Sequence, residues 1–191
     1  MATTLFLVRH GEAASTPAED PGLSELGRRQ AEAVATRLAH SGADSLVHSS
    51  KRRARETAEI IGTHLPHLVL ESSVHADDGT PMPTDRSSVP ARHWPFLDRV
   101  PPAERDPDGQ QLDGAVEHLG AVGTGDRSVI VVTHAFVIGW FVRHALDAPS
   151  WRWLGLNHLN GAVTTIEYTS DGARLVAFND SGHLPRVALQ V

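Results

Sequence analysis

Three short clusters of polar residues, each directly after an apolar run, contain the side chains of this chain that could do chemistry. The clusters are Arg9-His10-Gly11, residues 48–53 (His-Ser-Ser-Lys-Arg-Arg) and Thr133-His134-Ala135. A histidine that is neutral near pH 7 can act as a nucleophile, and the planar fork of donors in arginine matches phosphate oxygens. Two histidines and two arginines that meet at one point would therefore bind an anion and place a nucleophile against it.

Each cluster taken alone has an ordinary alternative interpretation. A histidine at a strand end is more often structural than catalytic, and Lys51, Arg52 and Arg55 are typical of a solvated basic helix face. Ser49, just before that helix, could donate a hydrogen bond to the site or cap the helix. The interpretation as a site therefore depends on a fold that brings the clusters together.

The apolar pattern predicts strands alternating with helices. Strands are expected at 5–8, 46–47, 68–70 and 128–133, and a hairpin at 162–168 and 174–178. Helices are expected at 24–41, 51–65, 110–122 and 135–146. This order predicts an α/β fold, a three-layer α/β/α sandwich with a mostly parallel, mixed central sheet. Ligands bind beyond the carboxyl ends of such strands, so the three clusters are expected at one edge of the sheet.

The segment 72–107 differs in composition from the rest of the chain, because it is rich in proline. Its prolines, at 81, 83, 90, 95, 101, 102 and 107, leave little room for a helix or a strand ladder. So long a loop is typically a functional lid or a disordered segment, and Trp94, Phe96 and Leu97 favour packing. We expect a lid over the site that determines specificity together with Trp151 and Trp153.

Length and composition exclude several classes of protein. A chain of 191 residues suits one domain, 1–191, and the absence of cysteine excludes disulfides and thiolate chemistry. The formal net charge of -6 argues against nucleic-acid binding, and no apolar run approaches the roughly 20 residues that span a membrane. The N-terminus lacks the pattern of a signal peptide, so a cytoplasmic location is expected. The 12 histidines show no helical pairing typical of zinc sites, and no metal is expected.

The three clusters also carry a family resemblance. Leu7-Val8-Arg9-His10-Gly11-Glu12 resembles the Arg-His-Gly signature of the histidine phosphatase superfamily, also called phosphoglycerate mutase-like. Residues 47–58, in which Ser49 lies four residues before Arg53, resemble the second block of that family, and residues 132–135 resemble the block with the second histidine. Further stretches at 47–50, 134–138 and 153–161 are most similar to the branch of serine/threonine phosphatases of the phosphoglycerate mutase 5 type.

The resemblance implies a role for each site residue, without a cofactor. His10 would form a phosphohistidine, and the phosphoryl group would be bound by the side chains and backbone of Arg9, Arg53, His134, Ala135, Gly11 and Ser15. The family usually places a glutamate after the third strand, and the phosphoglycerate mutase 5 branch places it just before Gly-x-Pro, where this chain has Asp78. Asp77, Glu12 or water are the alternatives for protonating the leaving group. In phosphoglycerate mutases the Arg-His-Gly signature typically continues with Glu-Ser-x-x-Asn, whose polar side chains help to bind phosphate. Here Glu12 is followed by Ala-Ala-Ser, and Ser15 is a substitute phosphate ligand.

The sequence therefore predicts a phosphomonoesterase that acts on a phosphorylated small molecule or a phosphoprotein. One alternative is a phosphoglycerate mutase-type isomerase, which would retain the phosphate after transfer. Another is a phosphate-binding or scaffold protein that has lost turnover. The oligomeric state stays open, with a homodimer among the options.

Overall fold

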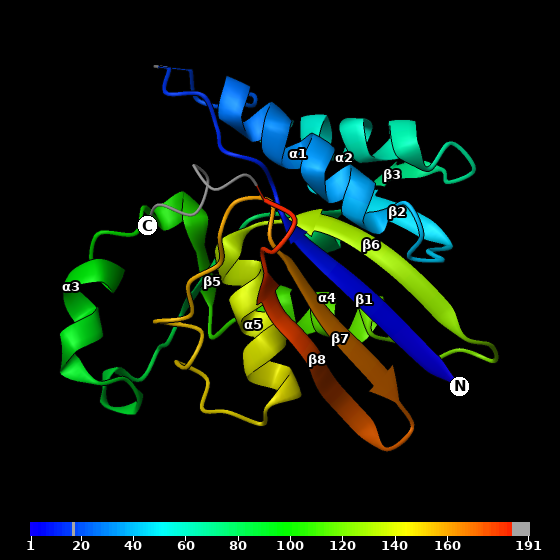
Figure 1. Cartoon of the computed structure of the whole chain (residues 1–191). Coiled ribbons are helices and arrows are strands. Elements are labelled where there is room, and N and C mark those ends of the chain that lie inside the picture. The colour runs from blue at the N-terminus through cyan, green and yellow to red at the C-terminus, as the bar shows by residue number, and fades with distance from the viewer. Residues whose placement is uncertain (17, 185–191) are drawn as a thin grey trace.

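The computed structural model describes residues 1–16 and 18–184, and a six-stranded sheet lies at its centre (Figure 1). The strand order is β3-β2-β6-β1-β7-β8. The bounds are β1 Ala2–Arg9, β2 Ser45–His48, β3 Leu70–Ser72, β6 Arg127–Thr133, β7 Val163–Thr169 and β8 Gly172–Asp180. Strands β3, β2, β6 and β1 run parallel, whereas β7 and β8 pair antiparallel. The mixed sheet predicted from the late hairpin is confirmed.

Helices cover both faces of this sheet (Figure 1). Their bounds are α1 Glu25–Leu38 and α2 Arg52–His64 on one face, and α4 Gln110–Leu119 and α5 Ala135–Ala145 on the other. Successive residues of the central strands point to opposite faces: Leu7 and Val131 pack with α4 and α5, whereas Val8 and Val132 pack with α1 and α2. Burial on both faces explains the unbroken apolar runs, and the three-layer sandwich is confirmed.

Several element boundaries differ from the predicted ones. Strand β3 begins at Leu70 rather than at residue 68, because the Leu68 amide donates to the Leu65 carbonyl and closes a turn after α2. Helix α1 ends three residues early, before Gly42 in the left-handed region at φ +69°. Helix α4 ends three residues early at its C-cap, Gly120. These ends depend on local turns rather than on the apolar pattern.

The prediction that the prolines of 72–107 leave little room for regular structure is wrong. The segment contains helix α3 Trp94–Leu97, the parallel strands β4 Thr80–Met82 and β5 Arg105–Pro107, and 3-10 helices η1 Val74–Ala76, η2 Arg86–Ser88, η3 Ala91–His93 and η4 Pro102–Glu104. Pro95 fits because it lies in the first turn of α3, where its missing amide hydrogen is not needed. Pro81 and Pro107 fit because their ladder has only two strands, both of them edges.

The predicted packing of this segment is confirmed at two of its three large apolar residues. Trp94 and Leu97 are buried and join the core with α4 and α5. The Trp94 indole nitrogen also donates to the Arg86 carbonyl at 3.2 Å. Phe96, in contrast, is 43% exposed. The segment is therefore anchored to the core and still presents an aromatic side chain at the surface.

The chain after β1 lies directly on the first turn of α1. A Cβ atom at Gly11 would overlap the Gly27 carbonyl, and a Cβ atom at Gly27 would overlap the Glu12 carbonyl. The hydroxyl of Ser24, the N-cap of α1, donates to Glu12 Oε1 at 2.7 Å. These contacts fix the backbone immediately after His10.

We predict that Gly27→Ala lowers the free energy of unfolding by about 1–3 kcal/mol, because the added methyl group must push two backbone segments apart. Gly114→Ala is the matched control: this glycine lies inside α4 with no atom within 4 Å of the added Cβ. It should raise the free energy of unfolding by about 0.5–1 kcal/mol through helix propensity. Urea denaturation measures both changes, and a Gly27→Ala protein as stable as the parent would contradict the close crossing.

Candidate active site

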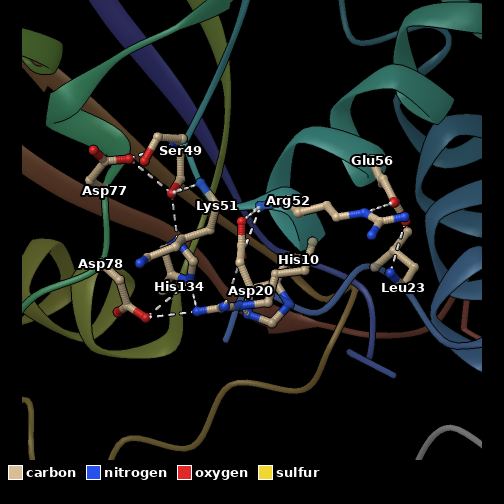
Figure 2. A network of polar contacts seen from close by, with 12 residues as sticks. His10, Asp20, Leu23, Ser49, Lys51, Arg52, Glu56, Asp77, Asp78 and His134 are labelled. Atoms are coloured by element: carbon tan, nitrogen blue, oxygen red, sulfur yellow. Dashed lines mark hydrogen bonds and ion pairs between the residues drawn. The ribbon is translucent and has the colours of Figure 1, made fainter. Parts of the chain in front are cut away.

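The three predicted clusters meet at the carboxyl ends of neighbouring strands. His10 follows β1, and its amide donates to the Thr133 carbonyl at 3.0 Å. Ser49 follows β2, and its amide donates to the Val132 carbonyl at 3.0 Å. His134 follows β6 and is the N-cap of α5. The register of the parallel strands therefore places both histidines and Ser49 side by side, as the sequence predicts (Figure 2).

The guanidinium of Arg53, in the first turn of α2, connects the two histidines. Its Nε atom donates to His10 Nε2 at 3.0 Å, and its Nη2 atom lies 3.1 Å from His134 Nδ1. The same Nη2 atom donates to Asp78 Oδ2 at 2.9 Å. Only 17% of the Arg53 side chain is exposed. The predicted residues His10, Arg53, His134 and Asp78 therefore form one connected cluster.

The hydrogen bonds of His10 define its tautomer. Its Nδ1 atom lies 2.8 Å from the Gly11 carbonyl, which only accepts, so Nδ1 carries the hydrogen. Nε2 therefore holds the lone pair and accepts from Arg53. Burial lowers the pKa of His10 to about 3, with the charges of Arg53 and Arg9 adding to the effect and the Gly11 bond opposing it. His10 is thus a neutral imidazole whose free lone pair faces a cationic group.

Arg9, at the end of β1, is a second mostly buried guanidinium. Its Nη1 atom donates to the His158 carbonyl, while its Nε atom is buried without a hydrogen-bond partner in the part of the chain that the structure describes. Burial lowers the pKa of Arg9, and its positive charge in turn lowers the pKa values of His10 and His134. Burial and the charge of Arg9 also lower the pKa of His158 to about 4. Arg9 therefore adds positive charge and an unpaired donor beside the cluster.

His134 and Asp78 are shifted toward their neutral forms. Burial, followed by the charges of His10, Arg53, Lys51 and Arg9, holds the pKa of His134 well below its usual value. Burial also raises the pKa of Asp78, Glu104 raises it further, and Arg53 and Lys51 oppose the shift. His134 Nδ1 and Asp78 Oδ2 are 3.3 Å apart. A carboxyl that retains its proton more readily than usual thus lies beside a neutral imidazole.

The structure separates the alternatives for the acid. Asp78 contacts Arg53, whereas the Asp77 carboxylate points away from this cluster and accepts from the Ser49 hydroxyl at 3.0 Å (Figure 2). Glu12 lies in the chain after β1 and accepts from Ser24, the N-cap of α1. Of the three carboxylates, Asp78 is the one that contacts both Arg53 and His134.

The other predicted phosphate ligands have mixed placements. The Gly11 amide donates to Thr57 Oγ1 at 3.0 Å, so it is engaged within the protein. Ala135 begins α5 directly after His134, at a helix N-terminus that favours anions. Ser15 is exposed and is not brought to Arg53 or His10 by any hydrogen bond of the described residues. The basic helix face predicted for Lys51, Arg52 and Arg55 is confirmed, because all three residues are exposed, and Arg52 and Arg55 pair with Glu56 and Glu59, respectively.

Two residues near the cluster, Asp20 and Asn160, were not predicted from the sequence as part of the site. Both Asp20 carboxylate oxygens accept from the Arg52 amide, at 3.1 and 3.0 Å, and Asp20 Oδ1 lies 4.0 Å from Arg53 Nη1. The Asn160 amide group donates to the His10 carbonyl at 2.9 Å. Asp20 lies in a polar loop without periodicity, so no signal in the sequence marks it. Asn160 lies in one of the stretches that carry the family resemblance, which is the signal that could have found it.

A cavity of about 370 Å³ opens beside Arg53 and Asp78. Its lining includes Glu19, Lys51, Arg53, Asp78, Gly79, Thr80, Ala103, Glu104 and Phe136. Ala103 and Glu104 belong to the Pro-rich segment 72–107, so that segment forms part of the cavity wall, whereas Trp151 and Trp153 do not line it. Within residues 1–16 and 18–184, no three His, Asp or Glu side chains are grouped to hold a metal ion.

Known proteins share both the sequence pattern and the fold. The sequence model of the histidine phosphatase superfamily (branch 1) matches residues 5–181. The mitochondrial serine/threonine-protein phosphatase PGAM5 of Rattus norvegicus is 32% identical over 190 residues, covering 95% of this chain and 64% of the relative. The human protein of the same name is also 32% identical and is 63% covered. The chain therefore spans somewhat less than two thirds of the length of these relatives.

Solved structures agree with the fold at lower identity. YhfR of Bacillus stearothermophilus superposes with a TM-score of 0.75 at 22% identity, covering 96% of this chain and 100% of that one. The phosphoglycerate mutase of Plasmodium falciparum superposes with a TM-score of 0.62 at 20% identity, covering 100% and 96%, respectively. At these identities the likeness is one of fold.

We predict that His10 keeps its Nδ1-protonated neutral form in solution down to about pH 3, since burial and two arginines disfavour the imidazolium. Nitrogen-15 NMR of the ligand-free protein distinguishes the two ring nitrogens and follows their titration. Arg53→Met, which removes one positive charge, should raise the pKa of His10. Titration of His10 near its ordinary value of 6.5 in the parent protein would contradict this description of the site.

Proposed function

Because the chain belongs to branch 1 of the histidine phosphatase superfamily, we propose that it hydrolyses phosphomonoesters through a phosphohistidine formed on His10. One observation carries this proposal: the lone pair of a neutral, buried His10 Nε2 faces the Arg53 guanidinium. His134 and Asp78 contact the same guanidinium. A nucleophile, donors for a phosphoryl group and an acid are thereby combined within hydrogen-bond reach.

The first step transfers the phosphoryl group to the enzyme. The substrate phosphate takes the place of the Arg53 Nε contact on His10, and Arg9, Arg53 and His134 stabilise the charge on its oxygens. The His10 Nε2–P bond forms as the P–O bond to the leaving group breaks. The leaving oxygen takes the proton of Asp78, which supports this role through its raised pKa.

The second step restores the enzyme. A water molecule attacks phosphorus while the Asp78 carboxylate takes a proton from it, and the N–P bond breaks. His10 regains its lone pair, Asp78 regains its proton, and inorganic phosphate leaves. The two steps together consume one water and release an alcohol and phosphate.

The cavity beside Asp78 would receive the leaving group. Its volume of about 370 Å³ suits a small alcohol or a phosphorylated side chain, and Phe136 gives it an apolar wall. The names of the PGAM5 relatives support phosphoserine and phosphothreonine in a protein as substrates. We therefore propose a phosphoprotein substrate first and a phosphorylated small molecule second.

Location and assembly stay predictions. A cytoplasmic location competes with the mitochondrial one in the names of the relatives. Across the described residues, no helix has the length and apolar character required to cross a membrane. A homodimer likewise stays a prediction.

We predict that His10→Asn lowers hydrolysis of an aryl phosphate by more than about 10⁴-fold and abolishes an acid-labile phosphoenzyme, because it removes the nucleophile. His48→Asn is the matched control, since His48 ends the parallel strand β2 of the same sheet and makes the same kind of hydrogen bond, from Nδ1 to the carbonyl of the next residue at 2.8 Å. It should retain the phosphoenzyme. Equal activity of His10→Asn and the parent protein would overturn the mechanism. Measuring phosphate release with and without bisphosphoglycerate distinguishes a phosphatase from a mutase.

We predict that Asp78→Asn slows hydrolysis of an alkyl phosphate by about 10²–10⁴-fold and that of a nitrophenyl phosphate far less, because a nitrophenolate leaves without a proton donor. In the parent, kcat/KM should fall at low pH as His10 gains a proton, near pH 3, and at higher pH as Asp78 loses its proton. Glu104→Gln should move the alkaline limb to lower pH, because Glu104 raises the pKa of Asp78. An equal loss on both substrates would exclude Asp78 as the acid.

A further inference from the structure

Asp77 has no role in the reaction proposed above, yet its carboxylate, like that of Asp78, accepts hydrogen bonds within the protein. Its Oδ1 atom accepts from the Ser49 hydroxyl at 3.0 Å and from the Ser50 amide at 2.6 Å. The Ser49 hydroxyl in turn lies 2.8 Å from His134 Nε2 (Figure 2). A carboxylate, a hydroxyl and an imidazole thus form a chain that ends in the site.

The directions of these hydrogen bonds follow from counting donors. A hydroxyl has one proton and two lone pairs, and an ionised carboxylate only accepts, so Ser49 donates to Asp77. The Lys51 amide donates to Ser49 Oγ at 3.2 Å and occupies one lone pair. Ser49 can then only accept from His134, so His134 Nε2 carries the hydrogen. Ser49 is fully buried and has all three of its hydrogen-bonding positions filled.

This arrangement determines which nitrogen of His134 faces the reacting group. With Nε2 protonated, Nδ1 holds the lone pair, and it lies 3.1 Å from Arg53 Nη2 and 3.3 Å from Asp78 Oδ2. In the ligand-free protein, Nδ1 can accept from Arg53. Once the imidazole is charged, Nδ1 becomes a donor at the position where the phosphoryl oxygens bind.

We propose that Asp77, acting through Ser49, is a positioning residue that fixes the tautomer of His134 and supports its imidazolium form when a phosphoryl group binds. This inference rests on the proposed function, because it assigns His134 the task of a charged donor. The charged and titratable groups around His134 are Arg9, Arg53 and Lys51, whose positive charges disfavour its protonation, His10, whose own protonation would do the same, and Asp78 on the Nδ1 side. On the Nε2 side, Asp77 supplies a compensating negative charge through one hydroxyl.

A purely structural role for Asp77 makes a different prediction. Its bond to the Ser50 amide holds the residues that lead into α2, and such a contact stabilises the fold without any effect on proton uptake. Asp106 provides the matched comparison, because its carboxylate accepts from the Gln111 and Leu112 amides at the start of α4, at 2.9 and 3.1 Å. Asp→Asn at either position removes the charge. Asp77 can keep both of its bonds because they share one oxygen, whereas Asp106 uses both oxygens and keeps one of its two bonds.

The test measures binding of inorganic phosphate against pH, which needs no turnover and so stays informative if the proposed hydrolysis fails. Binding of the dianion should be coupled to proton uptake by His134 and weaken as pH rises. Asp77→Asn should weaken binding by about tenfold, with the loss beginning at lower pH than in the parent, whereas Asp106→Asn should keep the parent profile. Ser49→Ala should allow a mixture of His134 tautomers by nitrogen-15 NMR.

The double variant Asp77→Asn/Ser49→Ala should bind phosphate no more weakly than Ser49→Ala alone, because the charge acts through the hydroxyl. Additive losses would overturn the proposal. So would a parent-like pH profile for Asp77→Asn, whatever its stability, or an unchanged Nε2-protonated His134 in Ser49→Ala.

Discussion

The chemistry of this site depends on one cation placed where water is scarce, the guanidinium of Arg53. It contacts His10, His134 and Asp78 at 2.9–3.1 Å, so the position of each group is defined relative to the same planar fork. Its own position follows from the fold, because Ala54 and Ala58 hold the first turns of α2 against the sheet. Burial lowers the pKa of both neighbouring imidazoles, and the positive charge of Arg53 adds to that effect.

The ligand-free site contains more buried positive charge than it neutralises. Arg53 donates to Asp78 at 2.9 Å and lies 4.0 Å from the half-exposed Asp20, and burial raises the pKa of Asp78. Arg9 retains a buried Nε donor with no partner among the described residues. Unpaired buried donors and uncompensated cations are costly, and a phosphoryl group offers negative charge and acceptor oxygens to both. The fold thus holds the site in a form that an anion completes.

Much of this site could be predicted from the sequence, because it depends on the ends of parallel strands. A buried apolar run followed by a polar residue marks a carboxyl end, and parallel strands place those ends at one edge. That rule alone brings His10, His134 and Ser49 together. What it cannot decide is the direction of a side chain in an irregular turn. Asp77 and Asp78 are adjacent and chemically alike, and only the path of the chain after η1 turns Asp77 toward Ser49 and Ser50 and Asp78 toward Arg53.

The same reason explains the remaining differences between the elements predicted from the sequence and those in the structure. Residues 68–70 are as apolar as a strand, but a turn hydrogen bond at Leu68 delays β3 until Leu70. The Pro-rich segment folds because isolated prolines fit first turns and two-stranded edges, a matter of position rather than composition. Glu104 reaches the cavity only through that fold. Residue patterns therefore do not predict the contacts that irregular segments make through tertiary packing.

His134 is charged when it gains a proton, and Asp78 is charged when it loses one. Burial therefore lowers the pKa of His134 and raises that of Asp78, and favours the neutral form of both. This leaves Asp78 more readily protonated and His134 with a hydrogen on Nε2 alone. A bound phosphoryl group is negative, so it favours the protonated form of both side chains at once. In the proposed reaction, the arrival of the substrate therefore keeps the proton on Asp78 for the leaving group and adds one to His134 for the phosphoryl oxygens. When phosphate leaves, the same burial and the same arginines favour the neutral imidazole again, and the site returns to the state in which it accepts an anion.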